Sequence, residues 1–268
     1  MNGPTDGPAG VAPDAAPTEP APWALQLAAR VEKLNPPLVT DIAAAAALAT
    51  IELVGHDNAQ PDGPWFEPVE AWQGGGRIRK IVRRARGAAW ERAQRPSGVT
   101  AQVRTAEVRS YLPSPTDTVA PEISALQIRS TDLPAPPSYE SYDDVDAYLY
   151  SLGVDSEQDS ETGAGDNAGG GRAEEPVLLI ALSPDVELSW GKAAAQAAHA
   201  GRILRRDASA DERRAWDEAN RPIAVIHPSH ALWAELLDHG AAPVRDGGFT
   251  EVAPGTLTAC ARWYPRPH

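Results

Sequence analysis

The chain has 268 residues, which is enough for two domains of ordinary size. Its formal net charge of −13 at pH 7 argues against a protein that coats nucleic acid uniformly, but it leaves room for a local basic site. Cys260 is the single cysteine, which excludes an internal disulfide framework and favours a reducing cytoplasm. The N-terminus has no apolar signal-peptide core, and the longest apolar stretch, 42–51, is too short to span a bilayer.

The first half of the chain predicts a tail followed by an α/β unit. Residues 1–21 are rich in Pro, Gly and acidic residues without periodicity, which indicates a disordered tail. We assign residues 22–128 to the unit that follows. Its pattern predicts a strand, a helix, a short helix, an ambiguous arginine-rich segment, another short helix and two short strands, at 23–31, 42–54, 68–73, 77–84, 88–95 and 99–112. Thr40 or Asp41 is the expected cap of the helix at 42–54.

An acidic stretch rich in glycine and proline, 129–174, separates this unit from the next. Its composition predicts a flexible linker, in which only an amphipathic piece at 142–152 could fold or dock. Residues 175–268 then predict a second α/β unit. Its strands are expected at 177–182, 223–227, 242–245 and 257–263, and its helices at 190–206, 209–219 and 229–239. Serines 189, 209 and 229 are the expected helix caps, and Cys260 is expected to be a buried, unreactive thiol.

The helix predicted at 190–206 carries the most distinctive pattern in the chain. Lys192, Gln196 and His199 are spaced i, i+4 and i+7, so they share one helix face among small residues. Small residues let a large ligand come close, and the positive N-terminal end of a helix favours anions such as phosphate. Arginine supplies most of the positive charge in this chain, so a lysine at 192 favours a specific role there.

Two motifs in the second unit resemble a known family. Gly191, Lys192, Ala195, Gln196, His199 and Ala200 match the G-K-x-x-A-Q-x-x-H-A signature of the type-2 peptidyl-tRNA hydrolases. The stretch 246–258 resembles the second signature of that family, roughly D-A-G-x-T-x-x-x-x-G-T-x-T. The motifs stand in the family's order, and the likeness covers about residues 175–265. Two positions depart from it: Gly247 replaces the usual alanine, and Phe249 stands where a basic residue is common.

The resemblance implies hydrolysis of the ester that joins a peptide, or an N-blocked amino acid, to the 3′-terminal ribose of tRNA. Such a site activates water, stabilises an oxyanion and holds an anionic polynucleotide. The residues implied as catalytic are Lys192, His199, Asp246 and Thr250. Lys192 would bind the terminal phosphate or stabilise the oxyanion, and Asp246 would accept a proton from water or orient His199.

Four further residues of the motifs are implied in substrate binding. Gly247 and Gly248 would expose backbone N–H groups in an oxyanion or phosphate nest, and Gln196 and Thr256 would orient the reacting groups. We expect no cofactor. We also expect no metal, because the histidines at 227, 230 and 239 lack the spacing of a zinc site.

Two other functions are compatible with the same residues. Phe249 and the acidic charge favour a pseudoenzyme that binds tRNA or another RNA without cleaving it. The third possibility is a scaffold that binds other proteins through the stretch 129–174. The motifs predict the enzyme because Lys192, His199 and Asp246 occur together with Thr250.

The two units also show parallel spacing. Trp72, Arg77 and Trp90 parallel Trp216, Arg221 and Trp233, and Arg104 with Pro113 parallels Arg245 with Pro254. We therefore expect two similar three-layer α/β/α units with mixed sheets, which form an intramolecular pseudo-dimer. Ile42, Ala49 and Thr105 would occupy the positions of Lys192, His199 and Asp246, so the first copy would lack the active-site groups. The alternative is an unrelated α/β domain that shares only the order of strands and helices.

Positive charge is concentrated between residues 77 and 95. The basic residues there are Arg77, Arg79, Lys80, Arg83, Arg84, Arg86, Arg92 and Arg95, with Glu91 as the one acid. They could neutralise tRNA phosphates, and we select Arg83 and Arg84 as candidate tRNA contacts. The alternative is a solvated face that pairs with the acidic linker or tail.

Overall fold

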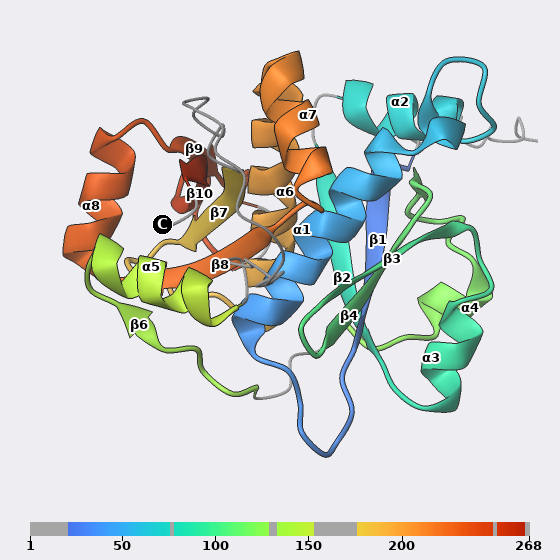
Figure 1. The fold of residues 1–268 in the computed structure, drawn as a ribbon. Helices are drawn as coiled ribbons and strands as arrows, with labels where there is room; N and C mark the ends of the chain where they lie inside the picture. The colour runs from blue at the N-terminus through green and yellow to red at the C-terminus, as the bar shows by residue number, and fades with distance from the viewer. Residues whose placement is uncertain (1–20, 76–77, 129–132, 153–175, 249–250, 266–268) are drawn as a thin grey trace, which may run out of the picture.

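The computed structural model describes residues 21–75, 78–128, 133–152, 176–248 and 251–265. Within these ranges the chain forms two mixed β-sheets with eight α-helices and one short 3-10 helix (Figure 1). The protein is therefore an α/β protein, as the sequence predicts. No helix in these ranges is long and apolar enough to cross a membrane.

The first sheet is built from the N-terminal half of the chain. Its strands are β1 (Trp23–Arg30), β2 (Arg79–Ala85), β3 (Gly98–Val103), β4 (Ala106–Tyr111) and β5 (Ser114–Pro115). Their order is β2-β1-β4-β3, and β5 pairs with the start of β1. β1 and β2 are parallel, whereas β4 is antiparallel to both β1 and β3.

The second sheet repeats this arrangement. Its strands are β6 (Ser138–Tyr139), β7 (Pro176–Leu182), β8 (Ile223–Pro228), β9 (Ala242–Arg245) and β10 (Leu257–Pro265), in the order β6-β8-β7-β10-β9. β7 and β8 are parallel, and β10 is antiparallel to β7 and β9. In chain order, β1 to β4 thus have the same neighbours and directions in the first sheet as β7 to β10 have in the second.

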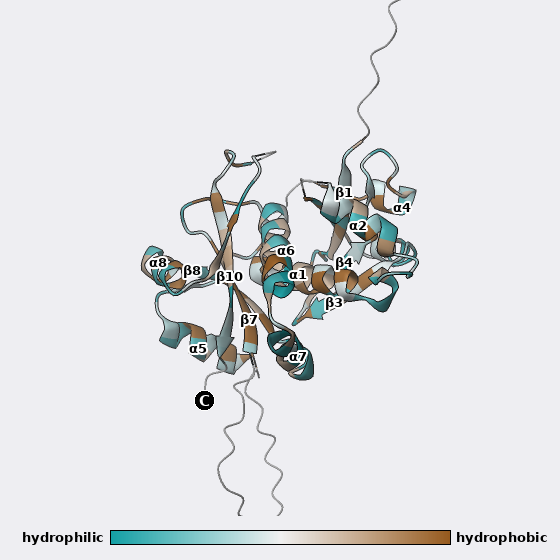
Figure 2. Ribbon diagram, turned by 90° about the horizontal axis from the view of Figure 1, so that it is seen from above, coloured by the Kyte–Doolittle hydropathy of each residue, from teal (hydrophilic) through white to brown (hydrophobic). Residues whose placement is uncertain are grey.

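Two long helices lie between the sheets. They are α1 (Val39–Gly55) and α6 (Trp190–Asp207), which pack against each other (Figure 2). Alanines of both helices enter one core cluster with the first sheet and another with the second. The approach is close, because a Cβ atom at Gly201 would lie 3.2 Å from Ile51 Cδ1 and 3.4 Å from Ala47 Cβ. Small side chains are therefore what allows one helix layer to serve both sheets.

Shorter helices complete the layers. They are α2 (Phe66–Gly74), α3 (Ala88–Ala93), α4 (Pro121–Ser124), α5 (Tyr142–Ser151), α7 (Ala210–Glu218) and α8 (His230–Asp238), with the 3-10 helix at Asp57–Ala59. Helices α3 and α4 cover the outer face of the first sheet, and α5 and α8 cover the outer face of the second. Each sheet accordingly has helices on both faces.

Most predicted elements are found within one to three residues of their expected positions. The ambiguous segment 77–84 is resolved as β2, because it pairs in parallel with β1 along its whole length. Ser189, Ser209 and Ser229 cap their helices as predicted. Cys260 is buried, and burial raises the pKa of its thiol to about 12.

Two expectations need correction. Helix α1 begins at Val39 without a side-chain cap, so Thr40 and Asp41 lie inside its first turn. Part of the predicted linker belongs to the second unit, because β6 forms the edge of its sheet beside β8. The piece at 142–152, for which the sequence left folding or docking open, forms α5 and buries Val145 and Leu149 in the outer core of that sheet. The capping box of α5 at Ser141 gives this helix a defined start. The predicted tail and the stretch 153–175 lie outside the described residues, apart from residue 21.

The close contact between α1 and α6 predicts that a larger side chain will not fit there. Ala194 is fully buried in the core cluster that α6 shares with α1 and the first sheet. We expect Ala194→Leu to lower the free energy of unfolding by about 1–3 kcal/mol, because the added carbons displace packed neighbours. Ala71→Leu, at an exposed position of α2, is the matched control and should change stability far less. Urea unfolding of both variants measures this, and equal stabilities would contradict the packing argument.

Candidate functional site

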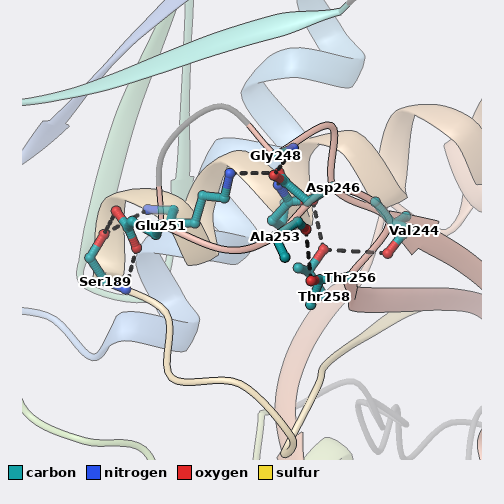
Figure 3. Close-up of polar contacts among 10 residues, drawn as sticks. Ser189, Val244, Asp246, Gly248, Glu251, Ala253, Thr256 and Thr258 are labelled. Carbon is teal, nitrogen blue, oxygen red and sulfur yellow. Dashed lines mark hydrogen bonds and ion pairs between the residues drawn. The ribbon is translucent and has the colours of Figure 1, made fainter.

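The start of α6 is fixed by Ser189 and Glu251. The Ser189 hydroxyl accepts a hydrogen bond from the Lys192 N–H at 3.2 Å, as an N-cap does. The same hydroxyl donates to Glu251 Oε1 at 2.6 Å, and the Ser189 N–H donates to Glu251 Oε2 at 3.0 Å (Figure 3). The loop after β9 is thereby attached to the end of the helix that carries Lys192. Sequence analysis had not singled out Glu251.

Asp246 stands at the centre of the site. It follows β9 directly, and its carboxylate accepts hydrogen bonds from Lys192 Nζ at 2.5 Å and from Gln196 Nε2 at 2.6 Å, both on Oδ2. Its other oxygen, Oδ1, accepts from the Gly248 N–H at 2.7 Å. The side chains of Lys192 and Asp246 are only 10% and 6% exposed. The two motifs identified in the sequence therefore meet at one buried carboxylate.

The loop after Asp246 is closed by its own backbone. The Asp246 N–H donates to the Thr256 carbonyl at 2.9 Å, and the Gly255 N–H donates to the Asp246 carbonyl at 2.8 Å. The Thr256 hydroxyl donates to the Ala253 carbonyl at 2.7 Å. Thr256 therefore joins the two ends of the loop by hydrogen bonds, and its hydroxyl bonds to the loop backbone and not to the Asp246 carboxylate.

Gln196 is oriented by a residue that sequence analysis did not select. Thr258 is fully buried, and its hydroxyl donates to Gln196 Oε1 at 2.8 Å. This contact turns the amide so that its NH₂ group faces Asp246. Thr258 is the last threonine of the second motif, and that position was the only signal for it in the sequence.

Hydrogen bonding decides the ionisation of Asp246. Burial raises the pKa of this carboxyl, but hydrogen bonds from Lys192, from the Gly248 N–H and from Gln196 outweigh that effect, and the pKa lies below its usual value. Asp246 is therefore a carboxylate at neutral pH. A carboxylate with a lowered pKa binds protons weakly, so it suits the positioning of a water or a cation better than the removal of a proton.

The structure does not bring His199 to this carboxylate. The Nδ1 atom of His199 lies 3.2 Å from Nζ of Lys80, which belongs to β2 in the first sheet. Burial is the largest cause that lowers the pKa of His199, and Lys80, Arg202 and Arg206 add to it, so that the pKa falls to about 3. The imidazole is neutral at physiological pH and faces the other unit. The expectation that Asp246 orients His199 is not met among the described contacts.

Arg83 does not fit a role in binding tRNA. Side chains alternate along a strand, and Arg83 points to the face of β2 opposite Lys80. Its guanidinium is buried. Its Nε donates to Gln26 Oε1 at 2.9 Å, and its Nη1 donates to the Leu126 carbonyl at 3.0 Å. Arg84 is half-buried and donates to the Gln127 side chain. Both arginines attach α4 and the segment after it to the first sheet. The buried guanidinium of Arg83 corrects the expectation that this residue contacts tRNA, whereas a tRNA contact by the half-buried Arg84 stays a prediction.

The remaining predicted residues are placed as follows. Gly247 is exposed at the start of the loop. Thr250 and Phe249 lie outside the described residues. In the parts of the chain that the structure describes, no three His, Cys, Asp or Glu side chains gather as metal ligands would.

A cleft of about 570 Å³ lies beside the start of α6. Leu188, Ser189 and Trp190 line one side of it, and Val39 of α1 lines another. The cleft therefore opens at the junction of the two units, one helical turn before Lys192. Its lining is mixed, with polar groups beside proline, leucine and tryptophan side chains.

Comparison with known protein families finds no family that matches this chain, and no curated protein matches it either. The resemblance to the type-2 peptidyl-tRNA hydrolases therefore stays a prediction from the two sequence motifs.

The low pKa of His199 predicts a pH effect on stability. The unfolded chain binds a proton on this histidine below pH 6.5, whereas the folded chain does not until about pH 3, so stability falls as the pH falls through this window. At pH 5 the loss is about 2 kcal/mol relative to pH 7. We expect His199→Asn to reduce the difference in unfolding free energy between pH 7 and pH 5 by this amount. Leu34→Asn, which changes an exposed residue that does not titrate, should keep the wild-type difference in the same urea titrations.

Gly248 and Gly255 offer a matched test of loop geometry. Both have positive φ, at +75° and +82°. A Cβ atom at Gly248 would overlap the ring of Pro254, whereas a Cβ atom at Gly255 would meet nothing. Gly255→Ala should therefore cost only the strain of a left-handed residue, about 1–2 kcal/mol. Gly248→Ala should cost more, because the loop must also move. Equal decreases in Tm for the two variants would mean that Gly248 is not packed closely against Pro254.

Proposed function

We propose that this protein hydrolyses the ester bond of peptidyl-tRNA, or of N-blocked aminoacyl-tRNA, and releases free tRNA and the peptide. The observation that carries the proposal is the meeting of Lys192 and Gln196, from the first motif, with Asp246, from the second, at a single carboxylate oxygen. Both motifs were selected by their resemblance to the type-2 peptidyl-tRNA hydrolases. The proposed enzyme is a carboxylic ester hydrolase that uses no cofactor, acts in the cytoplasm and has tRNA as its partner.

Each group has a role that follows from its contacts. The Lys192 ammonium is the group to stabilise the oxyanion that forms when water attacks the ester, or to bind the terminal phosphate. Asp246 holds that ammonium in place and can accept a hydrogen bond from the attacking water. Gln196, fixed by Thr258, adds a second donor at the same oxygen. His199 has no contact with these groups in the described part, so we assign it no proton transfer.

The resemblance implied that both glycines of the loop expose N–H groups to the substrate, but one of these groups bonds to the protein. The Gly248 N–H donates to Asp246 Oδ1, so of the two described glycines of the motif, Gly247 is the one whose N–H group we assign to an oxyanion. Thr256 contributes by closing the loop through its carbonyl and its hydroxyl. The role that the resemblance gives to Thr250, a hydrogen bond to substrate or water, is retained in the proposal.

We further propose that residues 22–128 are a degenerate copy of the domain at 175–268, and that the two form an intramolecular pseudo-dimer. The shared strand order and directions of the two sheets support this. In the first unit, Ile42 and Ala49 are fully buried, and Thr105 is exposed in the turn between β3 and β4. None of these positions offers an ammonium, an imidazole or a carboxylate. In this proposal β6 and α5 extend the second domain, and the rest of 129–174 connects the units.

A pseudoenzyme that binds RNA is the second candidate. The observation that favours it is that both oxygens of Asp246 already accept hydrogen bonds from the protein. A water would have to share these oxygens. The two candidates differ in turnover and agree in tRNA binding, so one assay separates them.

The test is cleavage of N-acetyl-aminoacyl-tRNA by the wild-type chain, Asp246→Asn and Lys192→Met. We expect each variant to lose at least about 100-fold in kcat/KM, because each removes one partner of a buried ion pair that faces the reacting ester. Lys33→Met, which changes an exposed lysine in the loop after β1, is the control and should cleave normally. Equal rates in all four proteins would reject the active-site assignment. Binding of tRNA without any cleavage by the wild type would favour the pseudoenzyme.

A further inference from the structure

A second group of polar side chains lies where α6 of the second unit meets α2 and β2 of the first. We call Trp72, Lys80, His199 and Arg202 the junction cluster. Lys80 Nζ lies 5.5 Å from the centre of the Trp72 ring, and the guanidinium carbon of Arg202 lies 5.8 Å from it. Lys80 also reaches His199 Nδ1 at 3.2 Å. Two basic side chains thus lie over one aromatic ring, and a histidine contacts one of them, so the cluster combines residues from both halves of the chain.

The junction cluster has no carboxylate partner among the described residues. The charged groups that act on Lys80 and His199 are Arg202 and Arg206, together with each other, and all of them are cationic or neutral. The nearest acid that acts on Arg202 is Asp207, which is exposed and forms its ion pair with Arg206 at 2.6 Å. Basic groups are therefore gathered here without an acidic partner among the described residues, in a chain whose net charge is −13.

Arg202 gives a more specific indication. Its side chain donates from Nη1 to Gln73 Oε1 at 3.1 Å, and the residue is only 5% exposed. Its Nε atom is buried and has no hydrogen-bond partner in the described structure. A buried guanidinium N–H that lacks an acceptor is costly, and arginine usually satisfies it with a carboxylate or a phosphate.

Burial and repulsion between the basic groups lower the pKa values of Lys80 and Arg202. Burial is the largest cause that lowers the pKa of Lys80 well below its usual value, and Arg202 adds to it. The pKa of Arg202 is lowered as well, first by burial and then by Arg206. A cluster that had evolved only to hold the two units together would be expected to include an acid. What this arrangement lacks is an anion.

We propose that the junction cluster binds a phosphate group of the RNA substrate, with Lys80 and Arg202 as its donors and His199 as the residue that positions Lys80. The assignment of the phosphate to RNA depends on the function proposed above. His199 follows Lys192 by two turns on the same helix face, which places it about 10 Å further along α6. An RNA strand whose 3′ end reaches Lys192 can therefore lay a backbone phosphate at the junction. In this arrangement the first unit contributes Lys80 to substrate binding although it lacks catalytic groups.

The first test uses inorganic phosphate and thermal unfolding of the full chain, in phosphate and chloride buffers of equal ionic strength. We expect phosphate to raise the wild-type Tm saturably, and Lys80→Met and Arg202→Met to weaken this response at least about tenfold in half-saturating concentration. Lys33→Met should respond as the wild type does. Without phosphate, Lys80→Met should unfold no more easily than the wild type, because it removes a buried basic group that has no acidic partner among the described residues. If the wild type shows no saturable response, or if Lys80→Met keeps it, the phosphate site is rejected.

The second test asks whether the phosphate belongs to RNA. Binding of uncharged tRNA to the wild type and to Lys80→Met is measured as a function of salt. Loss of one phosphate contact should lower the slope of log K against log salt by about 0.7–0.9, and Lys33→Met should keep the wild-type slope. If phosphate protects the wild type but Lys80→Met leaves the tRNA slope unchanged, the site takes free phosphate and the assignment to RNA is wrong.

Failure of the site and failure of the proposed function give different results. If the wild type cleaves N-acetyl-aminoacyl-tRNA but Lys80→Met behaves like the wild type in both binding tests, the junction site is wrong and the function stands. If nothing is cleaved but the phosphate response depends on Lys80, the function is wrong and the site stands. If both are right, Lys80→Met should raise KM several-fold and leave kcat near the wild-type value, whereas Asp246→Asn should lower kcat.

Discussion

Helices α1 and α6 lie against each other through alanine and glycine, and the positions of both sheets follow from this contact. Because the two helices form one layer, each of them faces both sheets, and neither sheet could be removed without exposing a helix of the other unit. The packing also determines which residues the polar face of α6 contacts. Its first turns reach the loop after β9, and its middle reaches Lys80 of the first unit. One helix thereby carries two polar sites in different surroundings.

The ion pair of Lys192 and Asp246 is better explained by function than by stability. Two charges that are almost completely shielded from water lose much of their hydration, and their attraction rarely exceeds that loss. Gln196 and the Gly248 N–H both donate hydrogen bonds to this carboxylate, and Thr258 orients Gln196. Several contacts that fix one side chain are typical of a group that must be positioned for a ligand. This arrangement supports the proposed hydrolase and gives it a rigid centre.

The proposed function also gives a role to the first unit, residues 22–128. If the first unit is the degenerate copy that we propose, it would stabilise α6 and, through the proposed phosphate site at the junction cluster, add a substrate contact. The alternation of side chains along β2 separates the two tasks. Lys80 faces α6 and the second unit, whereas Arg83 faces the opposite side and ties down the outer helix α4. The basic segment is thus neither a uniform tRNA-binding surface nor a merely solvated face.

The sequence by itself determined most of the strands and helices, the serine caps, the burial of Cys260 and the two motifs that meet at Asp246, because these depend on local pattern and spacing. It left β2 ambiguous and did not predict the short elements β5, α4 and β6. The tertiary structure alone decided what each side chain touches. Helical periodicity correctly puts Lys192 and His199 on one face, but two turns separate them, so they meet different neighbours. Likewise, only pairing with β8 and an apolar sheet face turned part of the acidic stretch into β6 and α5, since burial against a partner surface is not encoded in the segment itself.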